Sequence, residues 1–321
     1  MIIYLKEQGA KVTRHGELLV ISKDDKVIGN IHLFKIDGVV IIGRVHLSHD
    51  VLTAFLLKGI DTAFLSTKGK LYGRLIGTNS KNIILRMKQY QMVQNEPYCV
   101  EFSKEIISAK IRNMIRVLKE FYKNHPDPIL HDTAQKLNQW FRKIENKNKT
   151  NTILGIEGSA SALYFSCFKH MIRSDLTFKG RIKHPPGDEI NALLSFTYVL
   201  LGNEITNRLY AHGFDPYIGL YHGIQYGRPS LSMDIIEEFR PLVDRFIIRL
   251  VNLKVYRSEH FQKKNGGIYL STESLKEFLT HYEKWLHKKD SMNRTLRDII
   301  DKQILHLSEC LKKELPYKPF F

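Results

Sequence analysis

The pattern of apolar and polar positions divides the chain at about residue 80. Before this point, short runs rich in β-branched residues alternate with turn signals, as in GAKVTRHGELLVISKDDKVIGNIHLFKIDGVVIIG. The runs are separated at Arg14-His15-Gly16 and at Lys23-Asp24-Asp25, which is typical of β-hairpins. A helical segment interrupts them at residues 48–58, with Ser48 placed as its N-cap and Gly59 as the residue that ends it. This part of the chain is predicted to be β-rich.

From about residue 81 onward the apolar positions follow a helical period. Residues 104–122 carry an apolar stripe at positions 106, 107, 111, 114, 115 and 118. Further helices are predicted at residues 131–147, 153–172, 188–213, 232–253 and 271–289, with a short strand or hairpin near Gly267. Pro241 is expected to kink its helix or to end it near Arg240.

The predicted fold class is therefore α+β with two domains. A small N-terminal β-rich domain is expected at residues 1–85 and a linker at residues 86–100. A larger all-α domain is expected at residues 101–321.

Composition narrows the class of partner. Lys and Arg total 49 against 33 Asp and Glu, which gives a net charge of +16 and a pI near 9.6. Such an excess suits a polyanion, most commonly nucleic acid, although many basic proteins bind none. Cys99, Cys167 and Cys310 form no CxxC or zinc spacing, so a reducing cytoplasm is expected. The sequence shows neither a signal peptide nor an apolar run that could span a membrane, so no membrane partner is expected.

Three carboxylates stand beside core-forming apolar residues in the stretch YHGIQYGRPSLSMDIIEEFRP. Asp234 and Glu237 are three residues apart and share one face of a helix. They also have the outline of a capping box, which is the structural alternative to a functional pair. Glu238 lies about 100° further round the helix, where it could pair with Arg240 or Arg245.

Two other residues could join these acids. Glu157 lies among small residues in GIEGSASALYF, where a carboxylate needs solvent, a partner or a metal, or else caps the first turn of a helix. His222 lies in a glycine-rich loop, where an exposed or structural role is the alternative to metal ligation. Carboxylates with one imidazole form an oxygen and nitrogen ligand set that suits Mg²⁺ or Mn²⁺.

Four stretches in fixed order resemble the catalytic core of one known family. GIEGSASALYF, RIKHPPGDEINALLSFTYVLL, GFDPYIGLYHG and GRPSLSMDIIEEFRPLVDR are similar to motifs of the CRISPR-associated integrase family, the catalytic subunit of the spacer-acquisition complex ("Cas one"). The runs GAKVTRHGELLVIS, HLFKIDGVVIIG and GIDTAFLSTKGKLYGRL resemble the β-domain of that family, so the similarity spans nearly the whole chain. Carried over by motif, the resemblance implies that Glu157, His222 and Glu237 bind a catalytic divalent metal, Mg²⁺ or Mn²⁺, with Asp234 as a further acid near it.

The resemblance also implies an activity and a set of partners. The activity is that of a divalent-metal-dependent DNA endonuclease and integrase of CRISPR adaptive immunity, which inserts foreign DNA fragments as new spacers by 3′-hydroxyl attack on phosphodiesters. The implied partners are double-stranded DNA (protospacer and CRISPR repeat), a second copy of the chain, bound through the N-terminal domain, and a small CRISPR-associated partner protein ("Cas two"), in the cytoplasm of a prokaryote. Arg181, Lys183 and Arg228 flank the motifs and are expected to contact DNA phosphates.

Two alternatives stay open. A non-catalytic DNA-binding scaffold would use the acids only as structural residues, so that Glu157 and His222 could become Ala without loss. A metal-dependent ribonuclease or a general metal-dependent repair nuclease would use the same residues, on RNA or on branched DNA.

Overall fold

The computed structural model describes residues 2–36, 38–67, 71–75, 77, 82–182 and 185–320. The chain divides into two compact units, Met1–Lys81 and Asn82–Phe321. A strand-rich unit precedes a mostly helical one, which confirms the predicted fold class.

Two four-stranded sheets form the framework of the N-terminal unit in its described residues. In one sheet, β1 (Ile2–Leu5), β5 (Gly38–Ile42) and β7 (Asp61–Leu65) run parallel, and β8 (Leu71–Leu75) pairs antiparallel with β7. The other sheet has the order β4 (Lys26–His32), β3 (Leu18–Lys23), β2 (Lys11–His15) and β6 (His46–Leu47). Strands β2 to β4 form the hairpins that the turn signals predicted. Strand β5 is buried along its whole length, as expected for a central parallel strand.

Helix α1 (His49–Lys58) begins and ends as predicted. The Ser48 hydroxyl accepts a hydrogen bond from the Val51 amide at 3.4 Å, and Gly59 has a φ of 65°, the left-handed conformation that ends many helices. Val51 and Phe55 of this helix lie in the core of the unit, together with strand residues from both sheets.

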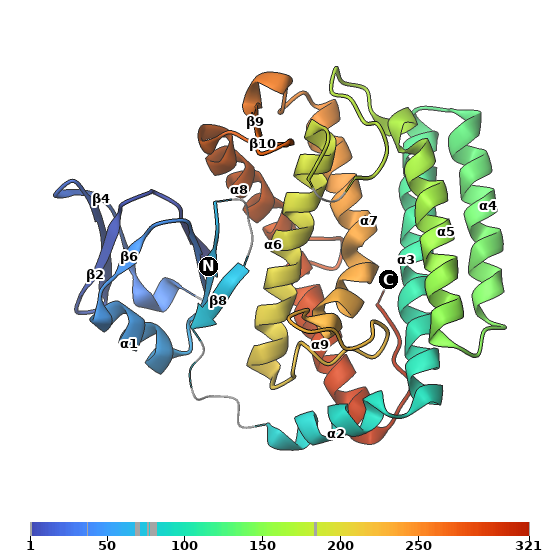
Figure 1. The fold of residues 1–321 in the computed structure, drawn as a ribbon, viewed down its shortest axis with the longest axis horizontal. Coiled ribbons are helices and arrows are strands. Elements are labelled where there is room, and N and C mark those ends of the chain that lie inside the picture. Colours follow the sequence, from blue (N-terminus) through green and yellow to red (C-terminus); the bar gives the residue numbers. More distant parts are fainter. Residues whose placement is uncertain are drawn as a thin grey trace. The chain divides into compact units, whose positions relative to one another are not determined.

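The C-terminal unit is built from helices, shown in Figure 1. Its described helices are α2 (Ile83–Val93), α3 (Glu96–Asn124), α4 (Pro128–Ile144), α5 (Thr150–Cys167), α6 (Glu189–His212), α7 (Ser230–Asn252), α8 (Thr272–His287) and α9 (Leu296–Lys313), with 3₁₀ turns η2 (Phe168–Met171) and η3 (Ser258–His260). Strands β9 (Phe261–Lys264) and β10 (Gly267–Leu270) form the short hairpin predicted before α8. No helix among the described residues is long and apolar enough to cross a lipid bilayer.

The predicted linker, residues 86–100, is helical instead. It comprises most of α2 and the start of α3. The side chains of Asn82 and Asn95 accept hydrogen bonds from the amides of Leu85 and Tyr98, at 3.3 and 3.2 Å, at the two helix starts. Because a capping asparagine satisfies an amide that would otherwise lack a partner, the connection forms two successive helices.

Helix α7 lies at the centre of the helical unit. It packs against α3 and α6 (Figure 1), and its acids Asp234, Glu237, Glu238 and Asp244 are all buried. The helix continues past Pro241, so of the two outcomes expected at this proline, a kink or an end near Arg240, the end is wrong. Buried apolar residues extend the helical stripe beyond the proline and hold the second half of the helix in the core.

Candidate active site

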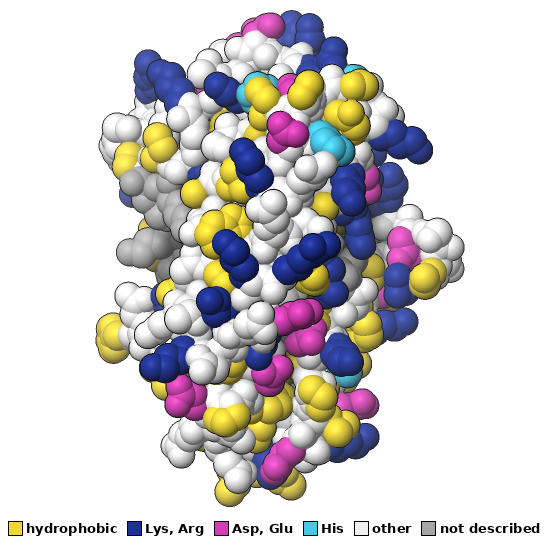
Figure 2. Space-filling view, turned by 90° about the vertical axis from the view of Figure 1, so that its right-hand side faces the viewer, with side chains coloured by type: hydrophobic (Ala, Val, Ile, Leu, Met, Phe, Trp, Pro, Cys, Tyr) yellow, Lys and Arg dark blue, Asp and Glu magenta, His cyan; other side chains and the backbone are white. Residues whose placement is uncertain are grey.

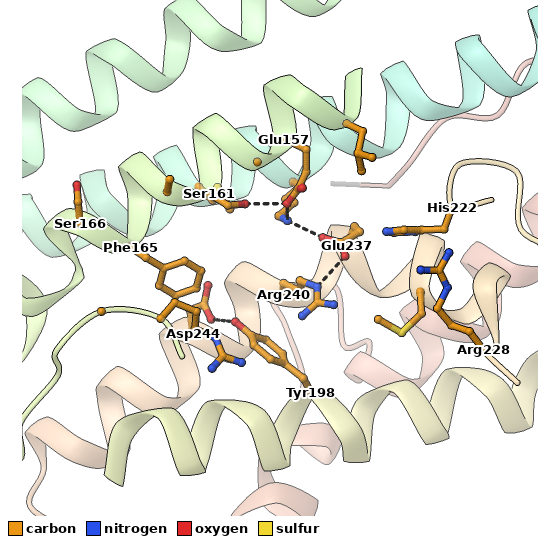
Figure 3. A pocket seen from close by; sticks show the side chains of 18 residues that line it. Glu157, Ser161, Phe165, Ser166, Tyr198, His222, Arg228, Glu237, Arg240 and Asp244 are labelled. Carbon is orange, nitrogen blue, oxygen red and sulfur yellow. Dashed lines mark hydrogen bonds and ion pairs between the residues drawn. The ribbon is translucent and has the colours of Figure 1, made fainter. Parts of the chain in front are cut away.

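A pocket of about 660 Å³ opens in the helical unit among α3, α5, α6, α7 and the loop of residues 213–229 (Figure 3). Its polar lining consists of Lys110, Glu157, Ser161, Ser166, Arg181, Tyr198, His222, Arg228, Glu237, Arg240 and Asp244. The three ligands predicted from the sequence thus line one pocket, although they come from a helix, a loop and a second helix.

Glu157 projects into the pocket from the interior of α5. The helix begins at Thr150, roughly two turns earlier, so the alternative of a first-turn capping acid is wrong. Glu157 Oε1 accepts a hydrogen bond from Ser161 Oγ at 2.7 Å. A Cβ added at Gly158 would meet no atom within 4 Å, and Ala162 also lines the pocket. The small residues of this motif therefore keep the cavity open.

Lys110 of α3 stands between the two predicted carboxylate ligands. Its Nζ atom donates to Glu237 Oε2 at 2.6 Å and also to Glu157 Oε1. The side chains of Lys110 and Glu237 are only 5% and 6% exposed, so water screens their charges weakly. Arg240, one turn further along α7, donates from Nε to the other Glu237 oxygen at 2.8 Å. The carboxylates of Glu157 and Glu237 thus converge on one buried cation, the lysine ammonium (Figure 3).

The charges of this cluster support one another. Burial by itself would raise the pKa of the Glu237 carboxyl, but Arg240 and Lys110 outweigh burial and lower that pKa to about 2. Burial would also lower the pKa of Lys110, but Glu237 and Glu157 outweigh it and raise that pKa above its ordinary value. Glu237, Lys110 and Arg240 are therefore charged at neutral pH and compensate one another.

Asp234, predicted as a further acid near the metal, organises the loop that carries His222. It is fully buried and accepts hydrogen bonds from the amides of Leu220, Tyr221 and His222 at 2.7, 3.0 and 2.8 Å, and from His222 Nδ1 at 2.8 Å. A carboxylate can only accept, so Nδ1 carries the proton and Nε2 of the neutral ring keeps a lone pair. The close packing also requires Gly219, where a Cβ would lie 2.9 Å from Asp234 Oδ2.

The capping-box alternative for the α7 acids is wrong, because α7 begins at Ser230 and both Asp234 and Glu237 lie inside it. The pocket face of α7 instead repeats every three or four residues, with Met233, Glu237, Arg240 and Asp244. At the far end of this face, Asp244 accepts a hydrogen bond from Tyr198 OH. Burial outweighs that bond and raises the pKa of Asp244 to about 7.

Glu238 lies on the other side of α7 and is not part of the pocket lining. Arg240 and Arg245, the two partners that the sequence offered for Glu238, form ion pairs with Glu237 and Glu120. Glu238 Oε1 instead accepts a hydrogen bond from the hydroxyl of Tyr317 at 2.6 Å. Burial outweighs this bond and raises the pKa of Glu238 to about 8, so the side chain is mostly protonated at neutral pH.

Two of the three residues predicted to contact DNA lie at the pocket. Arg228 lines it and donates from Nη2 to the Gly223 carbonyl at 2.8 Å. Arg181 lines it as well, but its guanidinium already donates to three protein oxygens, those of Ile182, Asn191 and Ser195. Lys183 lies outside the described residues.

The donor set fits a hard divalent cation, although the ligands are not preassembled. Within residues 2–36, 38–67, 71–75, 77, 82–182 and 185–320, no three His, Cys, Asp or Glu side chains are grouped closely enough to hold a metal ion. Glu157 and Glu237 nevertheless face a shared cation, and His222 offers Nε2 to the same pocket. Oxygen and imidazole donors of this kind suit Mg²⁺ or Mn²⁺. Coordination of one ion by all three residues stays a prediction, and it requires Lys110 to leave the carboxylates.

The model of the family "CRISPR associated protein Cas1" matches residues 3–284. The chain belongs to the Cas1 family. It is 33% identical to CRISPR-associated endonuclease Cas1 1 of Thermodesulfovibrio yellowstonii over 301 residues, 91% of this chain and 93% of the relative. A solved Cas1 protein of Thermotoga maritima is similar with a TM-score of 0.86 at 25% identity, over 97% of both chains. A chain of a Cas6-RT-Cas1–Cas2 complex shares the fold with a TM-score of 0.85 at 24% identity, over 99% of this chain and 36% of that one.

Cas1 membership confirms the resemblance carried by the four motifs, and with it the predicted class of enzyme, a CRISPR-associated nuclease. Three charged residues that line the pocket, Lys110, Arg240 and Asp244, were not among the predicted site residues. Lys110 stands within an apolar stripe, four residues from both Ile106 and Met114, and a lysine on a buried face is a signal in itself. Arg240 and Asp244 continue the helical face of Glu237 three and seven residues further on.

Proposed function

We propose that the chain is a divalent-metal-dependent DNA integrase, which inserts foreign DNA fragments as new spacers into a CRISPR array. The observation that carries the proposal is the convergence of Glu157 and Glu237 on one buried cation, in a pocket that His222 also lines. Two carboxylates that share a single ammonium can exchange it for Mg²⁺ or Mn²⁺. The open pocket leaves room for a phosphodiester beside them.

Each residue of the pocket has a distinct role in this proposal. A bound metal would supply polarisation of the phosphodiester and stabilisation of the charge that develops on it. Glu157 and Glu237 would hold the metal through carboxylate oxygens, and His222 would hold it through Nε2. Asp234 fixes the tautomer and the orientation of the imidazole, as the outer partners of metal-binding histidines commonly do. Lys110, released from the carboxylates, leaves a positive charge beside the phosphate.

The proposed reaction exchanges one phosphodiester for another. The 3′-hydroxyl oxygen of the incoming fragment bonds to the phosphorus at the repeat boundary, and the bond to the 3′ oxygen of the repeat strand breaks. The proton lost by the attacking hydroxyl is balanced by the proton gained by the departing one. Water in place of the 3′-hydroxyl gives endonuclease cleavage of the same bond.

Double-stranded DNA, as protospacer and as CRISPR repeat, is the proposed substrate. The net charge of +16 favours a polyanion, and Figure 2 shows Lys and Arg side chains spread over the face that α4 and α5 border. Arg228, at the pocket, is the better placed of the two described candidates for a phosphate contact, because Arg181 has committed more of its donors. Phosphate contacts of this kind make binding fall steeply with salt.

The proposed assembly contains further chains. We infer a homodimer formed through the N-terminal unit, and Cas2 as the small partner protein. The fold shared with a chain of a Cas6-RT-Cas1–Cas2 complex supports a Cas2 partner. The proposed place of action is the cytoplasm of a prokaryote, where the array lies.

A strand-transfer assay tests the proposal. The chain, Cas2, a labelled fragment with free 3′ ends and a repeat-containing duplex are combined in Mg²⁺, in Mn²⁺ and in EDTA. The labelled strand should join the repeat in either metal, and EDTA or the substitution Glu157→Gln should abolish joining. The matched control is Glu238→Gln, a buried acid outside the pocket.

The same assay separates the alternatives. A scaffold would bind DNA but show no metal-dependent joining or cleavage, and the Glu157 variant would behave as the wild type does. A repair nuclease would cleave branched DNA without joining the fragment to the repeat.

A further inference from the structure

Arg240 has only one hydrogen-bonded partner in the pocket, and that partner belongs to its own helix. Its Nε donates to Glu237 Oε1 at 2.8 Å, across three positions of α7. Ion pairs between neighbouring turns of a helix contribute little by themselves, and an arginine side chain loses much rotamer freedom when it is fixed. The guanidinium therefore needs a further contact if it is to keep one orientation.

The ring of Tyr198, on α6, supplies this contact. The guanidinium carbon of Arg240 lies over the ring, 4.7 Å from its centroid (Figure 3). This separation is within the range over which the face of an aromatic ring attracts a cation. Tyr198 is 8% exposed and the side chain of Arg240 17%, and such an attraction is stronger where water is largely excluded.

The ring of Tyr198 is itself fixed at two points. Its hydroxyl donates a hydrogen bond to Asp244, which is fully buried two turns further along α7 than Glu237. The guanidinium of Arg181 also lies over the ring, 5.4 Å from its centroid. Arg181 is held in turn by the three protein oxygens to which it donates. Tyr198 is therefore a rigid surface against which Arg240 rests.

The outer nitrogens of Arg240 remain available to a ligand. Across residues 82–182 and 185–320, the hydrogen bonds of its side chain to protein use Nε alone, which leaves Nη1 and Nη2 without a protein acceptor. Arg240 lines the pocket. A guanidinium presents its N–H groups in a planar fork that matches the oxygens of a phosphate, and Glu237 and Tyr198 together define where this fork points.

We propose that Tyr198 is a positioning residue, which orients Arg240 toward the phosphodiester bound in the pocket. This inference rests on the proposed function and assigns a role to a residue that acts through another side chain. Negative charge grows on the phosphoryl oxygens during transfer, and donors that already point at those oxygens stabilise it without reorganising. The ring thus removes in advance the freedom that Arg240 would otherwise lose when DNA binds.

Relaxation of the Arg240 Nε–H group in ¹⁵N-arginine-labelled protein tests the role in EDTA, without metal or DNA. The signal is assigned by its absence in Arg240→Lys. Tyr198 is replaced by phenylalanine or by pentafluorophenylalanine, which have nearly the same shape but opposite charge distributions over the ring face. The order parameter should stay near about 0.8 in wild type and in Tyr198→Phe, and should fall below about 0.6 with the fluorinated ring.

Strand transfer with Cas2 and Mn²⁺ provides the second measurement. Tyr198→Phe should stay within about threefold of the wild-type rate, and the fluorinated ring should lower the rate a further tenfold or so. In an Arg240→Met background the two rings should give equal rates, because a residue that acts through Arg240 has no effect once Arg240 is absent.

Tyr317 takes the same two replacements as the matched control, since it is another buried tyrosine whose hydroxyl bonds an acid of α7. Both should leave the order of Arg240 unchanged and strand transfer within about twofold of the wild type.

Three results would overturn the role of Tyr198. One is an equal order parameter, or an equal transfer rate, for the two rings at position 198. Another is a difference between the rings that persists in Arg240→Met, which would indicate direct contact of the ring with the substrate. The third is an equal loosening of Arg240 by the replacements at Tyr317, which would indicate a general loss of packing. A wild type without strand transfer would remove the proposed function, whereas the order parameters in EDTA would still decide whether Tyr198 fixes Arg240.

Discussion

Replacement of Lys110 by methionine should destabilise the metal-free helical unit and make its stability depend on divalent cations. Methionine is one atom shorter than lysine, so it keeps most of the buried side chain and removes its charge. The substitution therefore leaves Glu157 and Glu237 facing each other without the ammonium that both contact. A buried carboxylate that loses its partner retains the full penalty of its desolvation.

The size of the effect follows from the Glu237 carboxyl. Its pKa is lowered from 4.5 to about 2, which corresponds to about 3 kcal/mol of stabilisation at neutral pH. Arg240, the larger cause of this lowering, stays in the variant, whereas Lys110 also compensates Glu157. The free energy of unfolding should therefore fall by at most about 3 kcal/mol at pH 7. Because the folded-state pKa is depressed, this stabilisation is present above about pH 4.5 and is lost as the pH falls toward 2, so the difference between variant and wild type should shrink in acid.

Urea unfolding in EDTA, followed by tryptophan fluorescence, measures this change. Both tryptophans, Trp140 and Trp285, lie in the C-terminal unit, so the signal reports the unit that contains the pocket. The matched control is Lys104→Met, which removes another lysine of α3 from an acid pair whose Glu101 side chain is 62% exposed. An exposed pair contributes less than about 1 kcal/mol, so the control should stay near the wild type.

Saturating Mn²⁺ should restore most of the stability that Lys110→Met loses, because the ion then occupies the place of the ammonium. Equal, small effects of Lys110→Met and Lys104→Met in EDTA would refute the reasoning, since they would show that Lys110 does not neutralise the carboxylates. A large loss that Mn²⁺ does not reverse would show that the carboxylates bind no metal.

Three further predictions concern the acids of α7. Glu237→Gln should lower strand transfer at least about 100-fold, whereas Glu238→Gln should change it less than about twofold, because only Glu237 faces the pocket; equal rates for the two variants would contradict this. Burial raises the pKa of Glu238 from 4.5 to about 8, so the folded chain keeps a proton that the unfolded chain loses. The free energy of unfolding should therefore fall as the pH rises from about 5 to about 8. Glu238→Gln should reduce this dependence on pH in urea titrations, and an unchanged dependence would contradict the prediction. Asp234→Asn should weaken Mn²⁺ binding in calorimetry about 10- to 100-fold with DNA affinity retained, and wild-type Mn²⁺ affinity would show that the imidazole needs no such partner.

Local signals predicted the parts of the fold that local interactions determine. Ser48 and Gly59 marked the ends of α1 correctly, because a cap and a left-handed glycine act within a few residues. Pro241 does not end α7, because burial of the second half of the helix outweighs the missing hydrogen bond at the proline. This burial depends on packing against α3 and α6, and the sequence around Pro241 carries no information on those contacts.

The same difference between local signals and tertiary packing applies to the site. Motif order located Glu157, His222 and Glu237 in one pocket, but it did not distinguish the roles of neighbouring acids. Glu237 and Glu238 are adjacent in sequence, yet one is ionised against Lys110 and the other is mostly protonated against a tyrosine. Their difference arises from the elements packed on opposite sides of α7, and only the tertiary structure shows these elements.

Anomalous diffraction from crystals soaked in Mn²⁺ would show whether Glu157, His222 and Glu237 bind one catalytic metal ion. One Mn²⁺ peak is expected in the pocket, within about 2.0–2.6 Å of an oxygen of each glutamate and of His222 Nε2, with the Lys110 ammonium moved off the carboxylates. A saturated soak in which Lys110 still bridges Glu157 and Glu237, with Mn²⁺ elsewhere or absent, would contradict it.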